Sequence, residues 1–179
     1  GEQVLMAEPF YANYRTIVEI AGGKVLGIPT KLHDDFVLPD SNAIAKIIDS
    51  AEPKCVKAIL ISNPDNPTGK VYSKNELLEL FELAIKYDLW LIVDEVYKDF
   101  VYDQAEFHSA FKIASQLNCS DRLVVIDSIS KRFSACGARI GALISQNSEF
   151  CASALKYAQV RLSAGTIDQI GAIGLYQAN

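Results

Sequence analysis

The sequence predicts an α/β fold with three layers, in which a mostly parallel sheet lies between two layers of helices. Short, unbroken apolar runs recur along the chain, and such runs are typical of strands that are buried on both faces. Segments with helical periodicity separate these runs. Strands that alternate with helices form βαβ units, whose crossovers make neighbouring strands parallel. A chain of 179 residues is long enough for one domain that buries about 70% of its unfolded surface.

The first predicted unit is a strand, a helix and a second strand. The strand at residues 4–6 stops before Pro9, which cannot donate to a ladder. Residues 14–21 have helical spacing, and Gly22 supplies the left-handed conformation that commonly follows a helix. Residues 24–28 form the next strand.

A polar, irregular segment at residues 30–39 precedes the next unit. Ser41 is expected to cap a helix that reaches Ser50, with isoleucines at helical spacing on one face. Residues 56–61 then form an unbroken apolar strand.

The loop after this strand reads SNPDNPTG, and its two X-Pro bonds and its glycine predict a fixed shape. Ser73 and Glu76 form a capping box at the start of a helix that ends near Tyr87. Residues 89–93 are the following strand.

The remaining elements surround a polar loop. A less regular region to Cys119 leads to a strand at residues 123–126. Residues 139–144 form one more strand, which we expect to be antiparallel to its neighbour. Helices are predicted at residues 148–159 and from residue 166 onwards.

The chain shows no repeat, low-complexity tract or linker, so residues 1–179 are predicted to form a single domain. It begins without methionine, enters a strand almost at once and ends inside a helix-like segment. We therefore expect a piece of a longer protein.

Composition excludes several classes of protein. A net charge of −5 with mixed signs argues against nucleic acid as the main partner, and two histidines leave little for a metal site. Four cysteines without paired spacing indicate reduced thiols and a cytoplasmic location. The sequence has no apolar run of membrane-spanning length.

Reactive side chains follow three successive predicted strands. Asn66 follows the first, Asp94 and Tyr97 follow the second, and the segment from Ser128 to Lys131 follows the third. In an open α/β sheet, ligands bind beyond the carboxyl ends of the strands. These side chains are therefore expected to share one rim.

Lys131 lies just past a buried strand, where partial desolvation favours a neutral amine that attacks carbonyl groups. Ser128, Ser130 and Arg139 are suited to hold a phosphate. A lysine beside a phosphate site suggests a Schiff base with pyridoxal 5′-phosphate (PLP). PLP needs a negative charge at its pyridine nitrogen, and Asp94 suits that role. An ion pair at about 4 Å contributes roughly 4 kcal/mol at an effective dielectric near 20.

Four motifs in order resemble the class I/II aminotransferases, which are fold-type-I PLP enzymes. They are Glu8-Pro9-Phe10-Tyr11, NPDNPTG, the DEVY element with Asp94 and Tyr97, and the lysine signature from Ser128 to Gly141. The resemblance covers essentially the whole chain and is nearest in general likeness to aspartate aminotransferases. It implies the central part of the PLP-binding large domain of such an enzyme.

The resemblance also implies residue roles. Asp94 faces the ring nitrogen, and the Tyr97 hydroxyl and Asn66 meet the ring oxygen O3′. Tyr11 stacks on the ring, and the Asn66-Pro67 bond is cis. Arg161 lies in a segment that approaches the neighbouring subunit's site in relatives, where it would meet a substrate carboxylate.

Each of these residues also has an ordinary structural interpretation. Asp94 fits a helix cap or a surface aspartate, and Asn66 fits a turn without a ligand. The serines suit turns, Tyr11 suits a core or rim position, and Arg161 suits a solvated surface. Only the combination of motifs favours a PLP site.

Two parts of such an enzyme are expected outside this sequence. A glycine- and serine-rich phosphate loop would precede the first motif, and a small domain that binds the substrate's α-carboxylate would follow Asn179. Without them, the chain alone would bind PLP weakly or not at all and would be inactive.

The predicted function of the intact protein is a homodimeric PLP-dependent aminotransferase of amino acid metabolism. It would move an amino group between an amino acid and a 2-oxo acid through a Schiff base on Lys131, with no metal, membrane or nucleic acid partner. Alternatives remain open: a β-lyase, a decarboxylase or a cyclopropane-carboxylate synthase of the same fold, or a non-catalytic effector-binding domain of a regulator.

Overall fold

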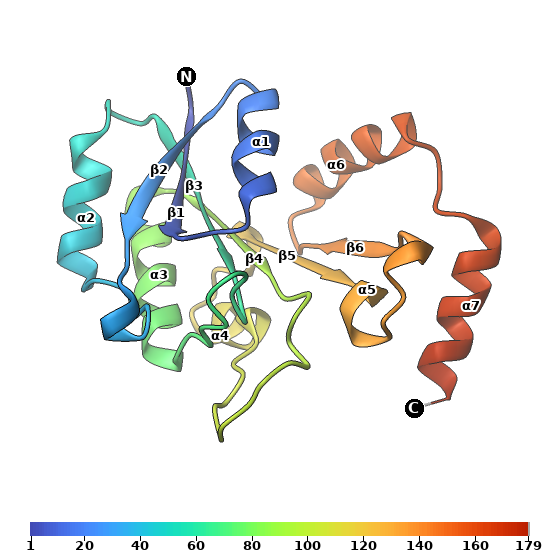
Figure 1. Ribbon diagram of the computed structural model, residues 1–179. Helices are drawn as coiled ribbons and strands as arrows, with labels where there is room; N and C mark the ends of the chain where they lie inside the picture. The colour runs from blue at the N-terminus through green and yellow to red at the C-terminus, as the bar shows by residue number, and fades with distance from the viewer. Residues whose placement is uncertain (179) are drawn as a thin grey trace.

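A six-stranded sheet lies at the centre of the computed structural model, which describes residues 1–178 (Figure 1). Asn179, the last residue of the predicted domain, lies outside this range. The spatial order of the strands is β2-β1-β3-β4-β5-β6. Their bounds are β1 (Gln3–Glu8), β2 (Lys24–Pro29), β3 (Val56–Ser62), β4 (Trp90–Asp94), β5 (Leu123–Ser128) and β6 (Gly141–Ile144).

Seven α-helices are present within the described residues. They are α1 (Ala12–Ile20), α2 (Ser41–Ser50), α3 (Lys74–Tyr87), α4 (Ala110–Gln116), α5 (Ile129–Arg132), α6 (Ser148–Val160) and α7 (Thr166–Gln177). The predicted alternation of strands and helices is therefore confirmed for the βαβ units.

Strands β1 to β5 are mutually parallel, and β6 runs antiparallel to β5, with Ser128 opposite Gly141. The chain steps from β1 outward to β2 and then back past β1 to β3. Because crossovers between parallel strands are right-handed, this reversal places α1 on one face of the sheet and α2, α3 and α4 on the other. Figure 1 shows α1 and α2 on opposite sides of the strands. The predicted three-layer α/β fold is confirmed.

The core lies between the sheet and the layer that contains α3. Strand residues Leu5, Ile59 and Leu91 are fully buried, as are Leu77 and Leu80 of α3. Burial of each such side chain contributes about 1.5–3 kcal/mol relative to exposure. This packing fixes the strands from which the polar loops extend.

The structure confirms one predicted helix cap and corrects the other. Ser73 and Glu76 form both hydrogen bonds of a capping box at the start of α3. At α2 the cap is Asp40, whose carboxylate accepts a 2.9 Å hydrogen bond from the Ala43 backbone N–H. The prediction for Ser41 was therefore wrong by one residue, because Asp40 has the non-helical backbone that a cap needs and Ser41 is already in the helix.

Other elements also differ from the predictions. Helix α4 forms inside the segment expected to be irregular, and α1 begins at Ala12 rather than at residue 14. Strand β6 begins at Gly141 because Arg139 adopts a left-handed conformation with φ of 54°. A residue in that conformation cannot continue a ladder.

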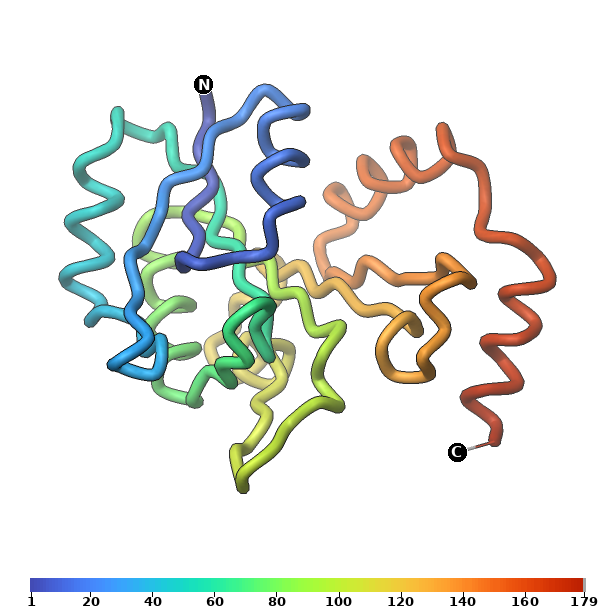
Figure 2. Tube along the Cα trace, viewed as in Figure 1, coloured from blue at the N-terminus to red at the C-terminus, as the bar shows by residue number. Residues whose placement is uncertain are grey.

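Helices α6 and α7 bury little of their apolar surface. No residue of α6 is buried, and only Ala172 of α7 is. Figure 2 shows α7 lying beyond α6, away from the parallel strands. Among residues 1–178, no helix has both the length and the apolar composition that a membrane crossing requires.

Candidate active site

A hollow of about 270 Å³ lies at the carboxyl ends of the parallel strands. It brings together the eight residues predicted to bind the cofactor: Tyr11, Asn66, Asp94, Tyr97, Ser128, Ser130, Lys131 and Arg139. Tyr14, Val96 and Cys136 complete its lining. The expected common rim is therefore present, with one amine, one carboxylate and one amide facing the same space.

The loop after β3 presents Asn66 through a tight set of local hydrogen bonds. The Asp65 carboxylate accepts a 2.6 Å bond from the Thr68 hydroxyl, and the Gly69 backbone N–H donates to the Asp65 carbonyl. Gly69 has φ of 75°, which its missing side chain permits. The Asn66-Pro67 bond is cis, as the resemblance to the aminotransferases implied.

Asp94 ends β4, and its carboxylate accepts two hydrogen bonds. The Tyr14 hydroxyl donates to Oδ2 at 2.7 Å, and the Val96 backbone N–H donates to Oδ1 at 3.1 Å. Burial raises the pKa of Asp94 above its ordinary value, and these two bonds oppose the rise. Burial, followed by the charge of Asp94, also raises the pKa of Tyr14, so its hydroxyl remains a donor.

Lys131 lies in α5, a single helical turn directly after β5. Its side chain is half-buried, and its Nζ lies 5.4 Å from the centre of the Tyr97 ring. This distance is within the range of a cation–π contact. The amine and the Tyr97 ring are therefore neighbours within the hollow.

The two serines differ in their contacts. The Ser128 hydroxyl caps α5, because its oxygen accepts a 3.1 Å bond from the Ser130 N–H. It also lies 2.8 Å from the Ile140 carbonyl and 2.9 Å from the Ser130 hydroxyl. A hydroxyl carries only one proton. Ser128 must therefore release a present partner to donate to a ligand. The Ser130 hydroxyl, in contrast, has Ser128 as its one hydrogen-bond partner among residues 1–178.

Arg139 is exposed at the edge of the hollow, where its Nη1 donates a 3.0 Å bond to the Cys136 carbonyl. A guanidinium has five N–H donors, so this single bond leaves others for an anion. The hollow holds two cations, Lys131 and Arg139, against one carboxylate, Asp94. This balance favours an anionic ligand such as a phosphate.

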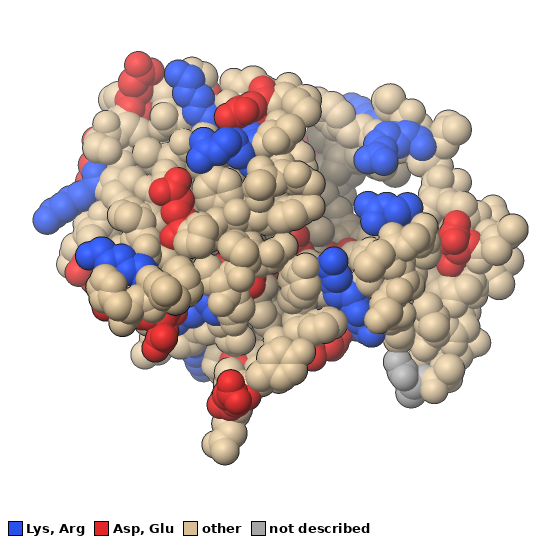
Figure 3. Space-filling model, in the orientation of Figure 1, with Lys and Arg blue, Asp and Glu red and all other residues tan. Residues whose placement is uncertain are grey.

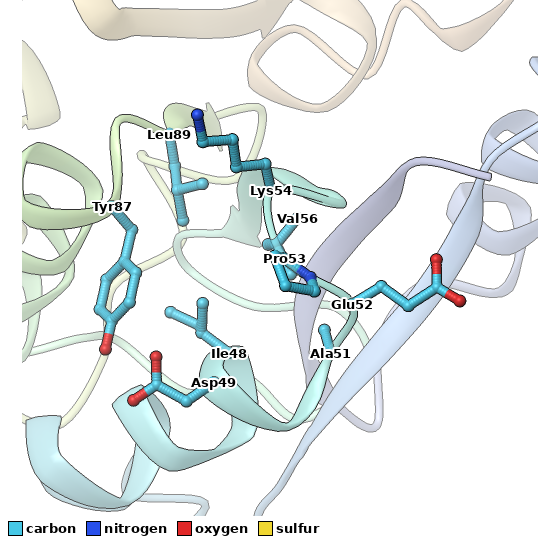
Figure 4. A pocket seen from close by; sticks show the side chains of 9 residues that line it. All are labelled: Ile48, Asp49, Ala51, Glu52, Pro53, Lys54, Val56, Tyr87 and Leu89. Carbon is cyan, nitrogen blue, oxygen red and sulfur yellow. The ribbon is translucent and has the colours of Figure 1, made fainter.

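A second hollow, of about 240 Å³, lies at the opposite edge of the sheet (Figure 4). Its walls are mainly apolar, and its charged side chains are Asp49, Glu52 and Lys54. Two carboxylates against one ammonium disfavour a phosphate there.

Acidic and basic side chains are interspersed over the face shown in Figure 3.

The structure does not bring Arg161 to the hollow. It follows α6 as the exposed C-cap residue and does not line the cavity. In the part of the chain that the structure describes, no group of three or more His, Cys, Asp or Glu side chains is arranged to hold a metal.

Tyr14 lines the hollow and bonds to Asp94, and the sequence reasoning missed it. It lies three residues after Tyr11 in α1, and side chains at this spacing share one face of a helix. Their rings form an edge-to-face pair with centroids 5.4 Å apart. This spacing, once Tyr11 is placed at a ligand site, was the signal that could have identified Tyr14.

The fold and the site define an α/β protein that presents an amine, a carboxylate, hydroxyl groups and a guanidinium beyond the ends of parallel strands. Residues 1–172 match the family described as aminotransferase class I and II. The chain belongs to this family.

Individual relatives agree with this assignment. The chain is 36% identical over 141 residues to an aspartate aminotransferase of Pyrococcus abyssi, covering 79% of this chain and 34% of the relative. It is 35% identical over 143 residues to aromatic-amino-acid aminotransferase 2 of Thermococcus litoralis, covering 80% and 35%. A solved aspartate aminotransferase from Thermus thermophilus with maleate matches with a TM-score of 0.82 and 30% identity, covering 94% of this chain and 41% of that one. The chain thus spans about a third to two-fifths of the length of these proteins.

Proposed function

We propose that the intact protein is a PLP-dependent aminotransferase that moves an amino group between an amino acid and a 2-oxo acid. One observation carries this proposal: all eight residues predicted from the sequence line one hollow with a net positive charge. The family to which the chain belongs, and the names of its relatives, support the same reaction.

The donors around the hollow fit PLP by their chemistry. Asp94 offers a carboxylate for the pyridine nitrogen, and Asn66 and Tyr97 offer donors for the ring oxygen. Arg139 and Ser130 offer N–H and O–H groups for the phosphate, with Ser128 as a further hydroxyl. Tyr11 offers a ring face. When bound, PLP supplies an aldehyde and an electron-accepting ring.

Lys131 has two roles in the proposed reaction. Its amine, after loss of a proton, is the nucleophile that holds the cofactor. Once a substrate amine has displaced it, Nζ would take a proton from the substrate Cα as general base and deliver it to the cofactor carbon C4′ as general acid. Asp94 stabilises positive charge on the ring, and its contacts with Tyr14 and Val96 keep its carboxylate aimed into the hollow.

A PLP titration of the intact protein tests this function. The wild type should develop the visible absorbance of protein-bound PLP and transfer amino groups to a 2-oxo acid. Lys131→Ala should lose both. Normal turnover by Lys131→Ala would refute the role of Lys131, and release of ammonia or carbon dioxide instead of a new amino acid would favour a lyase or a decarboxylase.

A homodimer is part of the proposal. The apolar residues exposed on α6 and α7 support it, among them Tyr157, Val160 and Ile167, each at least 80% exposed. Within such a dimer, Arg161 would meet a substrate carboxylate at the partner's site. Native mass spectrometry tests the proposed dimer, because a monomer at micromolar concentration would contradict it.

We also propose a cytoplasmic location, which the free thiols of all four cysteines support.

A further inference from the structure

A group of four charged residues, which we call the charged clamp, joins the segment after β4 to the end of β5. Lys98 and Asp99 belong to the first segment, Asp127 belongs to the end of β5, and Arg132 belongs to the adjoining helix α5. Lys98 Nζ lies 2.5 Å from Asp127 Oδ2, and Arg132 Nε donates a 2.6 Å bond to Asp99 Oδ2. Arg132 Nη2 lies 3.9 Å from Asp127 Oδ2, so the two pairs form one network.

Three of the four clamp side chains are partly shielded from solvent. Asp127, Arg132 and Lys98 are 14%, 20% and 25% exposed, whereas Asp99 is 49% exposed. Shielded pairs with short, charge-assisted hydrogen bonds are screened less by salt and hold their geometry better than exposed pairs do.

Each half of the clamp adjoins a residue of the hollow. Tyr97 precedes Lys98, and Lys131 precedes Arg132. None of the four clamp residues lines the hollow. The clamp therefore ties together, from outside, the two backbone segments that carry the Tyr97 ring and the Lys131 amine.

The helical turn that carries Lys131 needs stabilising contacts from outside the turn. Helix α5 has only four residues, and a helix of this length has too few internal hydrogen bonds to persist by itself. Arg132 supplies contacts in two directions. Besides Asp99, its Nη1 donates a 3.1 Å bond to the Tyr176 hydroxyl in α7. Phe133 packs edge-to-face on the same Tyr176 ring, with centroids 5.0 Å apart.

We propose that Arg132 is a positioning residue, which holds Lys131 at a fixed place relative to Tyr97 through the charged clamp. The planar guanidinium reaches Asp99 and Tyr176 at once, which the single ammonium of a lysine does not reproduce. The first part of this proposal, that Arg132 stabilises the turn that carries Lys131, is independent of any ligand. The second part, that this turn positions Lys131 for PLP, rests on the proposed function.

The chain contains a matched control for Arg132. Arg122 forms an ion pair with Asp88 across the same two strands, but at their amino ends. Its guanidinium lies 5.8 Å from the Trp90 ring centre, as that of Arg132 lies 5.7 Å from the Tyr176 ring centre. Arg122→Met and Arg132→Met thus each remove an ion pair and a contact with an aromatic ring, at the amino and the carboxyl ends of the same strands, and Arg132→Met also removes the bond to the Tyr176 hydroxyl.

Hydrogen exchange of the intact apo protein tests whether Arg132 stabilises the turn that carries Lys131. Arg132→Met should accelerate exchange of the amides in residues 129–134 by about tenfold, because the turn opens more often. Arg122→Met should leave these amides unchanged. Equal rates in wild type and Arg132→Met would overturn the proposal. Asp99→Asn, which keeps the guanidinium, tests the same contact if Arg132→Met does not fold.

A PLP titration of the intact protein then tests whether Arg132 positions Lys131 for the cofactor. Arg132→Met should weaken PLP binding about tenfold and shift the pH midpoint of the visible absorbance, with partial recovery in Arg132→Lys. An unchanged midpoint and affinity, despite faster exchange, would overturn the positioning role. If the wild type itself bound no PLP, the proposed function would fail, and the exchange comparison would still decide the clamp.

Discussion

The Tyr14 hydroxyl donates a 2.7 Å hydrogen bond to Asp94 Oδ2 and thereby connects the start of α1 to the end of β4. The Tyr14 ring also packs edge-to-face on Tyr11. One residue thus contacts both the carboxylate proposed for the pyridine nitrogen and the ring proposed to stack on the cofactor. Loss of its hydroxyl should therefore affect cofactor binding without a change in shape.

Tyr14→Phe should weaken PLP binding of the intact protein by about tenfold. The substitution keeps the ring contact but removes a hydrogen bond to a half-buried carboxylate, and such a bond contributes about 1.5–3 kcal/mol. The pKa of Asp94, already raised by burial, should rise further, so less of the carboxylate is charged. An absorbance titration with PLP at several pH values measures both effects.

Tyr11→Phe is the control for this experiment. The Tyr11 hydroxyl accepts a 2.8 Å bond from the exposed Asn13 side chain, away from Asp94. Its removal should leave PLP affinity within about twofold, since only the ring is proposed to act. If both variants lost affinity equally, the Tyr14–Asp94 bond would not be the cause.

Ser128→Ala and Ser130→Ala should separate capping from phosphate binding. Ser128 caps α5 and lies within hydrogen-bond distance of the Ile140 carbonyl, so its loss should reduce the free energy of unfolding by about 1 kcal/mol. Ser130→Ala should leave apo stability nearly unchanged, and both variants should weaken PLP binding. Urea denaturation of the apo protein measures the first effect. Equal stability of the two variants would contradict the capping role.

Glu95→Gln should stabilise the protein above neutral pH. Glu95 is buried, and its Oε1 accepts a 2.9 Å bond from the Ala110 N–H, which a glutamine oxygen also accepts. Burial raises the pKa of Glu95 above its ordinary value of 4.5. A raised pKa in the folded state contributes stability below the ordinary value and loses it as the pH rises through the folded value. The gain in Tm should therefore appear at high pH and vanish below 4.5.

The hydrogen bond between the Ala110 N–H and Glu95 explains why α4 could not be predicted. Its N-cap residue, Ser109, makes no side-chain cap bond, and the N-terminus is capped by Glu95 from the preceding loop. Start signals for helices are local, whereas this cap comes from 15 residues away. In contrast, the capping box of Ser73 and Glu76 is local, and the helix that it predicted is present.

The residues that line the candidate site could largely be predicted because their signals are also local in the sequence. Its residues follow strands whose apolar character is evident in the sequence, and parallel strands bring their carboxyl ends together. The contact of Tyr14 with Asp94 depends on how α1 packs, across 80 residues of sequence. The charged clamp likewise depends on pairing between segments about 30 residues apart, which no local pattern specifies.

Glu76→Gln should have the opposite effect to Glu95→Gln. Burial opposes the charged form of Glu76, but hydrogen bonds from Ser73 and Leu38 and the ammonium of Lys70 at 3.2 Å lower its pKa below its ordinary value of 4.5. A lowered pKa contributes stability above the ordinary value and loses it as the pH falls through the folded value. Glutamine keeps an acceptor but loses the charge, so it should reduce the free energy of unfolding by about 1–2 kcal/mol at neutral pH.

Denaturant unfolding from neutral pH down through 4.5 measures this difference. The wild type and Glu76→Gln should converge at the acid end, because both then carry an uncharged side chain at the start of α3. Ser73→Ala serves as the control, since it removes the cap hydroxyl but keeps the carboxylate, and its deficit of about 1 kcal/mol should persist at low pH. If the deficit of Glu76→Gln also persisted there, its cause would be the altered shape of the side chain, and the charge of Glu76 would not stabilise the helix.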